Sequence, residues 1–94
     1  MALEFEWNAA KAAGNRKKHG VSFAEASTVF GDPLARLVDD PRHSAAEERL
    51  VLIGHSRRGR LLAVMFTERG QAIRLVSARR ATSSERIEYE ESQR

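Results

Sequence analysis

The stretch Ile73-Arg74-Leu75-Val76-Ser77-Ala78-Arg79-Arg80-Ala81 joins the pattern of an inner β-strand to a pair of adjacent arginines. Side chains alternate between the two faces of a strand, so the pattern predicts apolar groups on both faces and places Arg80 on the face of Arg74. Thr82 and Glu85 follow with the spacing of a capping box, whose two side chains satisfy free backbone N–H groups at a helix start. The sequence therefore predicts a strand, two arginines and a helix N-terminus in one place.

Length and composition indicate one small folded domain over residues 1–94. A hydrophobic content of 41% allows a modest core, and 31% charged residues are typical of a soluble, ordered chain. The absence of cysteine excludes a disulfide framework and thiol chemistry. No apolar run reaches the length of a membrane span and the N-terminus lacks a signal-peptide pattern, so we expect a cytoplasmic protein with no membrane contact.

The positive charge is concentrated in one segment. The whole chain carries a net charge of +3, but residues 49–80 contain eight arginines and one acidic residue, while residues 1–48 and 81–94 each carry −2. Arginine is suited to bidentate phosphate contact, so a polyanion is the favoured partner; the alternative is a solvated sheet rim paired with carboxylates. Arg16 to His19 form a second basic cluster at a predicted helix C-terminus, where cations also offset the helix dipole.

The N-terminal third predicts one strand and two helices. Apolar and acidic residues alternate over residues 3–7, as in an edge strand with one wet face. Asn8 is suited to cap a helix over residues 9–19, and the glycine directly after this helix is suited to end it. A second capping box over residues 22–25 predicts another helix, which continues to about residue 30.

The remainder predicts a sheet and a short final helix. Residues 34–38 form a short strand, and an antiparallel meander follows over residues 48–56, 60–68 and 71–78. The middle strand is apolar on both faces, so both faces of the sheet need cover. We expect an α+β fold with two N-terminal helices on one face, and a helix over about 83–91, a partner chain or both on the other.

Asp39, Asp40 and His43 are side chains of the metal-ligand type in one polar loop. No second histidine follows at ligand spacing, so an ordinary turn is the preferred interpretation. We therefore predict no metal site and no cofactor.

An ordered set of short motifs extends over nearly the whole chain. The set comprises Phe5-Glu6-Trp7, Lys11, Lys18-His19-Gly20-Val21-Ser22-Phe23 with Glu25-Ala26, Asp32-Pro33, Gly54, and Ser77-Ala78-Arg79-Arg80-Ala81 with Glu85 and Tyr89. In this order and spacing the set resembles the BrnT toxin family. Asn8 stands where the family usually has aspartate and Val76 where isoleucine is usual, and both residues keep the capping or strand character.

The resemblance implies a RelE-like α/β fold and a ribonuclease activity that inhibits translation, with RNA as the substrate, either free or on the ribosome. It also implies neutralisation by a BrnA antitoxin, a ribbon-helix-helix DNA-binding protein, so that operator DNA is contacted only through the antitoxin. The alternative function is a non-catalytic basic binding module that partners a DNA-binding antitoxin in transcriptional autorepression.

Metal-independent RNA cleavage requires proton transfer at the 2′-hydroxyl and the leaving oxygen, and stabilisation of the charge on phosphorus. Arg79 and Arg80 are the candidates for the phosphate clamp, with Arg80 preferred because it is predicted to share a face with Arg74. His19 is the preferred general acid or base, since the unperturbed pKa of histidine is about 6.5; the alternative is a helix-capping role. Lys18 would give electrostatic support, or would act as a base only if nearby guanidinium groups favour its neutral form.

Glu85 and Tyr89 complete the catalytic candidates. Glu85 is a capping residue first, and Tyr89, one helical turn later, is predicted to stack on a base or donate a proton, or to pack on the sheet. His55, near a strand end, is interpreted as structural. The basic residues predicted to contact RNA are Arg16, Lys17, Arg57, Arg58, Arg60 and Arg74.

Overall fold

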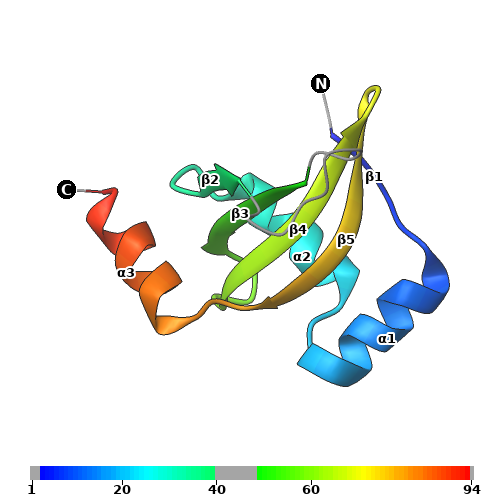
Figure 1. Cartoon of the computed structure of the whole chain (residues 1–94), viewed down its shortest axis with the longest axis horizontal. Helices are drawn as coiled ribbons and strands as arrows, with labels where there is room; N and C mark the ends of the chain where they lie inside the picture. Colours follow the sequence, from blue (N-terminus) through cyan, green and yellow to red (C-terminus); the bar gives the residue numbers. More distant parts are fainter. Residues whose placement is uncertain (1–2, 40–48, 94) are drawn as a thin grey trace.

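In the computed structural model, which describes residues 3–39 and 49–93, five strands form one mixed sheet. The elements are β1 (Glu4–Glu6), α1 (Ala9–His19), α2 (Phe23–Thr28), the 3-10 helix η1 (Val29–Gly31), β2 (Arg36–Asp39), β3 (Leu50–His55), β4 (Leu61–Arg69), β5 (Ala72–Arg80) and α3 (Ser83–Glu91). The strands lie in the spatial order β1-β5-β4-β3-β2 (Figure 1). The α+β class predicted from the sequence is confirmed.

The sheet is mixed, whereas the sequence predicted an antiparallel one. β3, β4 and β5 form the expected antiparallel meander and β2 pairs antiparallel with β3, but β1 runs parallel to β5. The prediction was wrong for β1 because most of the chain separates it from β5, so no hairpin turn fixes their relative direction.

The predicted caps define the first two helices. The backbone N–H of Lys11 donates to Oδ1 of Asn8 at 3.0 Å, and Gly20 ends α1 in the left-handed conformation with φ of 71°. Ser22 Oγ accepts from the backbone N–H of Glu25 at 3.0 Å and starts α2. The helix over residues 9–19 is therefore confirmed, while the second one is α-helical only to Thr28 and continues as η1.

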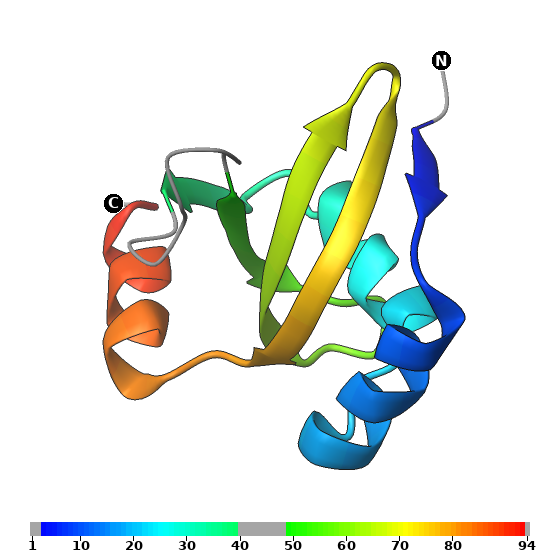
Figure 2. The ribbon, with the colours of Figure 1, turned by 45° about the vertical axis from the view of Figure 1, so that its right-hand side comes forward.

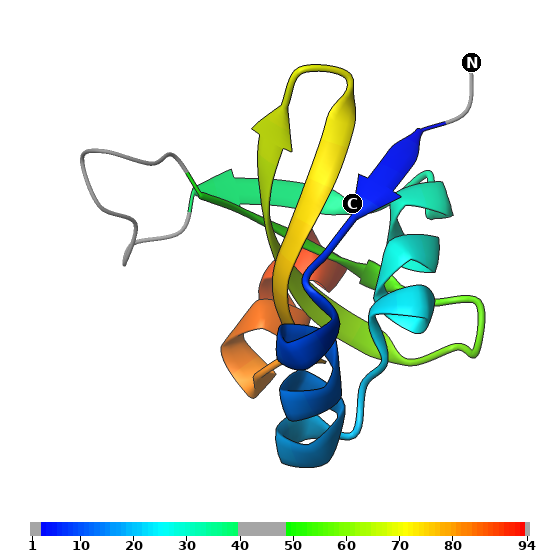
Figure 3. The same ribbon diagram turned by 90° about the vertical axis from the view of Figure 1, so that its right-hand side faces the viewer.

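The sheet separates two hydrophobic clusters. On one face Phe23 and Val29, from α2 and η1, pack with residues of β4 and β5 that include Leu62. On the other face Tyr89 of α3 packs with residues of β3 and β4 that include Ile53. Figure 2 shows α3 on one side of the sheet and α1 and α2 on the other, and Figure 3 shows α3 behind the β4–β5 hairpin. Both faces of β4 are thus buried within the chain.

A register shift in the β4–β5 pair changes which arginine faces which side. Met65 pairs with Ser77 and Phe66 pairs with Leu75, so β5 carries one extra residue, Val76, at this point, the pattern of a β-bulge. Arg74 pairs with Thr67 and Arg80 pairs with Leu62; Thr67 and Leu62 differ by an odd number of residues and so lie on opposite faces of β4. The prediction that Arg80 shares the face of Arg74 is wrong, because the bulge reverses the alternation between them.

The predicted polar loop can be followed only in part. Asp39 ends β2, but Asp40 and His43 lie outside the described residues. Within residues 3–39 and 49–93, no group of three or more His, Cys, Asp or Glu side chains is arranged to hold a metal ion. In the same ranges no helix is both long enough and apolar enough to cross a membrane.

Candidate active site

A pocket of about 430 Å³ lies where the end of α1 meets the sheet. It is lined by Lys18, His19, Arg49, Met65, Val76, Ser77 and Arg79. These side chains include three permanent cations and one imidazole, and none of these lining residues is acidic. We refer to this site as the cationic pocket; its charge suits a phosphate-bearing ligand.

The fold brings the cations together from distant parts of the chain. Lys18 and His19 occupy the last turn of α1, Arg49 directly precedes β3, and Arg79 is the second-last residue of β5. Arg79 pairs with Ala63, a residue of the cluster on the α3 face, so it is the residue that the β5 bulge turns toward the pocket. Of the six catalytic candidates, the structure places Lys18, His19 and Arg79 around one pocket.

Arg79 is held at the pocket by Glu85. Its Nη1 lies 2.7 Å from Oε1 and its Nη2 lies 3.0 Å from Oε2 of Glu85, a two-point contact between planar groups. Glu85 Oε1 also accepts from the backbone N–H of Thr82 at 2.8 Å, which completes the predicted capping box of α3. The hydrogen bond from Arg79 lowers the pKa of Glu85, although burial opposes this shift. Glu85 therefore both caps α3 and orients the guanidinium.

Tyr89 lies away from the cationic pocket and fastens α3 to the sheet. Its side chain is buried, with 4% exposed, and its hydroxyl donates to Oδ2 of Asp32 at 2.8 Å. The hydroxyl oxygen also lies 3.2 Å from Nδ1 of His55. Burial, together with the hydrogen bond to Asp32, raises the pKa of Tyr89. The interpretation of His55 as structural agrees with this contact.

Asp32 is the carboxylate at which these contacts meet. The backbone N–H of His55 donates to Oδ2 at 2.8 Å and that of Leu34 donates to Oδ1 at 2.9 Å. Burial raises the pKa of Asp32, but the hydrogen bonds from His55, Leu34 and Tyr89 outweigh it, so the pKa lies below its usual value. An ionised Asp32 thus links the β2 entry, the end of β3 and α3.

Glu25 does not act as a full capping-box residue. Its Oε2 accepts from Ser56 Oγ at 2.7 Å and from Arg60 Nε at 2.9 Å, and Arg60 Nη2 also contacts Oε1. The hydrogen bond from Arg60 lowers the pKa of this buried carboxyl, while burial opposes the change. The expected contact from Glu25 back to the start of α2 is replaced because the connection between β3 and β4 offers stronger partners, one of them cationic.

The predicted RNA-binding residues do not form one surface. Arg60 is paired with Glu25, and Arg74 Nη1 lies 3.5 Å from Oε1 of Glu6. The exposed side chains in this set are Arg16 and Lys17 on the last turn of α1, and Arg57 and Arg58 in the turn between β3 and β4. Arg16 and Lys17 share the last turn of α1 with Lys18 and His19 of the cationic pocket, whereas Arg57 and Arg58 lie in another part of the chain and do not line it.

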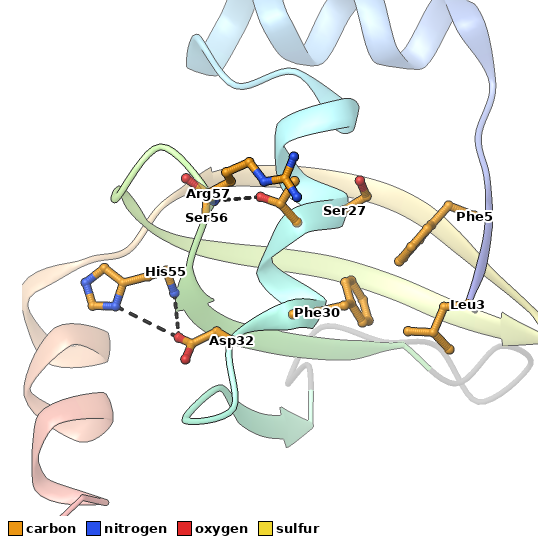
Figure 4. A pocket seen from close by; sticks show the side chains of 10 residues that line it. Leu3, Phe5, Ser27, Phe30, Asp32, His55, Ser56 and Arg57 are labelled. Carbon is orange, nitrogen blue, oxygen red and sulfur yellow. Dashed lines mark hydrogen bonds and ion pairs between the residues drawn. The ribbon is translucent and has the colours of Figure 1, made fainter. Parts of the chain in front are cut away.

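A second pocket, of about 640 Å³, is lined by residues of β1, α2, η1 and the end of β3. Leu3, Phe5 and Phe30 line one end and Asp32, His55 and Arg57 line the other, as Figure 4 shows. Its lining is apolar at one end and of mixed charge at the other, so it lacks the concentration of cations that a phosphate site requires. We therefore take the smaller cationic pocket as the candidate active site.

Two residues in the region of the site were not predicted from the sequence to belong to it. Arg49 was counted in the basic segment, but only the position of the β3 start shows that it lines the pocket. Asn15, a buried polar residue inside α1, was not singled out, because an asparagine in a helix has no sequence pattern that reveals its partners.

The mixed sheet and the cationic pocket together define a class, that of small α+β proteins equipped to hold a phosphate-bearing substrate. The comparison with family models makes this specific. The model described as ribonuclease toxin, BrnT, of type II toxin-antitoxin system matches residues 7–85, and this chain belongs to the BrnT family. It is therefore a ribonuclease toxin of a type II toxin-antitoxin system, which implies an antitoxin partner.

A solved structure supports this assignment. The chain is similar to the 1.1 Å crystal structure of the Brucella abortus ribonuclease toxin BrnT, with a TM-score of 0.66 and 26% sequence identity. The match covers 87% of this chain and 100% of that chain. A comparison with curated protein sequences finds no match. The family resemblance stated from the sequence is confirmed.

Proposed function

We propose that this toxin is a metal-independent endoribonuclease of RelE-like fold that cleaves messenger RNA in the cationic pocket and thereby inhibits translation. The observation that carries the proposal is the convergence of Lys18 and His19 from α1 with Arg79 from β5 around one pocket. Three fixed cations there supply the charge stabilisation that phosphoryl chemistry demands.

The three cations and the histidine of the cationic pocket each have a role in this mechanism. Arg79 and Arg49 bind the non-bridging oxygens of the scissile phosphate and stabilise the negative charge of the phosphorane. His19 transfers the proton at the 2′-hydroxyl or at the 5′ leaving oxygen, as a histidine does near neutral pH. Lys18 holds the phosphate as a point charge.

The other three catalytic candidates, Glu85, Tyr89 and Arg80, are assigned roles that involve no contact with the reacting atoms. We assign Glu85 to the orientation of Arg79 and Tyr89 to the attachment of α3, because their polar atoms already bind protein partners. Arg80 is exposed, and we assign it, with Arg16 and Lys17, to contacts with the RNA backbone outside the pocket.

We propose a BrnA-like ribbon-helix-helix protein as the antitoxin, and a cytoplasmic site of action on RNA that is free or held by the ribosome. Bound antitoxin blocks access to the cationic pocket, and operator DNA contacts the toxin only through the antitoxin. Membership of the BrnT family of type II toxins supports an antitoxin partner.

The test is incubation of the purified chain with bare RNA and with translating ribosomes, each with and without EDTA. We expect RNA cleavage in at least one of the two EDTA samples, and its loss when the antitoxin is added. Cleavage that needs an added metal would overturn metal independence. No cleavage in any sample would favour the non-catalytic binding module instead.

A further inference from the structure

The side-chain amide of Asn15 takes the place of a neighbouring strand at the edge of β5. β1 pairs with residues 72–74 of β5, and among residues 3–39 and 49–93 no strand lies beside the rest of that edge. There Asn15 Oδ1 accepts from the backbone N–H of Ala78 at 3.0 Å, and Nδ2 donates to the carbonyl of Ala78 at 2.8 Å. This two-point contact reproduces the hydrogen bonds that a strand partner would make.

The remaining hydrogen-bonding positions of the Asn15 amide are also occupied. Nδ2 donates its second hydrogen to the carbonyl of Val21 at 2.9 Å, and Oδ1 accepts from Ser77 Oγ at 3.2 Å. Asn15 is buried, with 8% exposed, and its two donors and two acceptor positions are therefore all occupied. A primary amide is suited to this arrangement because it presents a donor and an acceptor side by side, as a peptide group does.

The contact joins the two elements that supply the cationic pocket. Asn15 lies one turn before Lys18 and His19 on α1, and its partner Ala78 directly precedes Arg79 on β5. The same amide binds the carbonyl of Val21, just beyond the glycine that ends α1. The end of α1 lies beside the end of β5 in Figure 1, so a shift at this contact moves the α1 cations relative to the guanidinium.

We propose that Asn15 is a positioning residue for the ribonuclease: it sets the distance between the cations of α1 and Arg79 so that both bind the same phosphate. The inference rests on the proposed function of the cationic pocket. A displacement of about 1 Å in a preorganised site lowers the rate by up to about 100-fold, so the contact matters beyond its effect on stability.

The test measures binding of an RNA oligonucleotide with 2′-O-methyl groups, which removes the nucleophile and so separates binding from cleavage. Asn15→Leu keeps the residue neutral and similar in size, and Asn15→Ser is measured beside it in case the leucine variant does not fold. Val29→Ala is the matched control, because it lowers stability from a core position that does not line the cationic pocket.

We expect each folded Asn15 variant to bind about tenfold more weakly than Val29→Ala, and this extra loss to shrink to about twofold in a Lys18→Ala background. Equal binding by the Asn15 variants and the control, or a full loss in the Lys18→Ala background, would overturn the positioning role alone. If Lys18→Ala and Arg79→Ala each bind the oligonucleotide as tightly as the wild type does, the cationic pocket is not the RNA site.

Discussion

At the scale of single residues, Arg79 and Arg80 are neighbours in sequence with different surroundings. Arg79 lines the cationic pocket and makes a two-point contact with Glu85, whereas Arg80 is exposed and pairs across the sheet with Leu62, on the opposite face. The pair therefore offers a matched comparison in which one positive charge is removed from each side of the same strand.

Arg79→Ala is expected to lower the single-turnover rate of RNA cleavage by about 100- to 1000-fold, because it removes a donor that stabilises the phosphorane. Arg80→Ala, the control, is expected to change the rate by less than about tenfold, since it removes only an outer backbone contact. Cleavage assays with both purified variants check this. A larger loss for Arg80→Ala would show that the wrong arginine has been placed at the phosphate.

The ionised, buried Glu25 leads to a second prediction, which concerns the free energy of unfolding and its dependence on pH. Its folded-state pKa is lowered, chiefly by the hydrogen bond from Arg60, so its contribution is present above the unfolded pKa and is lost as the pH falls through the folded pKa. Glu25→Gln is expected to lower the free energy of unfolding at pH 7 by about 2–3 kcal/mol, somewhat below the cost of breaking a fully buried pair because Arg60 keeps access to water.

Urea unfolding of wild type and Glu25→Gln at pH 7 and near pH 3 measures this difference. The gap between the two proteins should narrow as the pH falls below the unfolded-state pKa of a glutamate, because the stabilisation that comes from the lowered folded-state pKa of Glu25 is lost in that direction. Glu90→Gln, at an exposed position on α3, is the control and should change stability by less than about 0.5 kcal/mol. A gap that stays constant with pH would contradict an ionised Glu25.

At the scale of elements, α3 is attached to the rest of the chain by few side chains. Its cap binds Arg79 through Glu85, Tyr89 binds Asp32, and Glu88 Oε1 lies 3.0 Å from Nε of Arg36 on β2. Its aliphatic residue Ile87 is 54% exposed. α3 is therefore held by these polar contacts and by the buried ring of Tyr89, so this one side chain contributes both kinds of contact.

Tyr89→Phe is expected to lower the free energy of unfolding by about 1 kcal/mol, the typical net value of one hydrogen bond, while the ring still fills its place in the core. Amide hydrogen exchange should rise in α3 more than in β4, because the helix opens locally. Ile87→Ala, which alters an exposed side chain of the same helix, should leave both quantities nearly unchanged. Uniform acceleration across β4 and α3 would contradict local docking by Tyr89.

Most helices and strands could be predicted from the sequence, because helix caps and hydrophobic alternation are local signals. Asn8, Gly20 and Thr82 cap helices as predicted. The β5 bulge was not predicted, because it adds one residue without any distinctive glycine or proline, and it moved the pocket-facing position from Arg80 to Arg79. The direction of β1 was also missed, because it depends on a pairing across nearly the whole chain.

At the scale of the molecule, the arginines counted in the sequence lie in different surroundings. Arg60 and Arg74 face Glu25 and Glu6, while Arg49 and Arg79 line the cationic pocket with Lys18, where Arg79 also contacts Glu85. The sequence indicated the excess of arginine, but not which ones meet carboxylates, since those partners come from other elements. The residues that meet at the cationic pocket were thus predictable as candidates but not as a set.

RNA binding should depend on salt as expected for a few phosphate contacts. If the pocket and the end of α1 neutralise three or four phosphates, a plot of log affinity against log salt concentration has a slope of about −2 to −3 for single-stranded RNA. Fluorescence anisotropy with the uncleavable oligonucleotide gives this slope, and Lys18→Ala should reduce its magnitude by somewhat less than one. A slope near zero would contradict binding through phosphates.

The central claim is that the end of α1 and the end of β5 act on one phosphate. Single-turnover RNA cleavage in EDTA by wild type, Lys18→Ala, Arg79→Ala and the double variant tests it most directly. Residues that stabilise the same transition state are non-additive, so each single variant should lose most of the activity and the double variant should lose little more. Single variants that cleave at the wild-type rate, or losses that multiply independently, would contradict it.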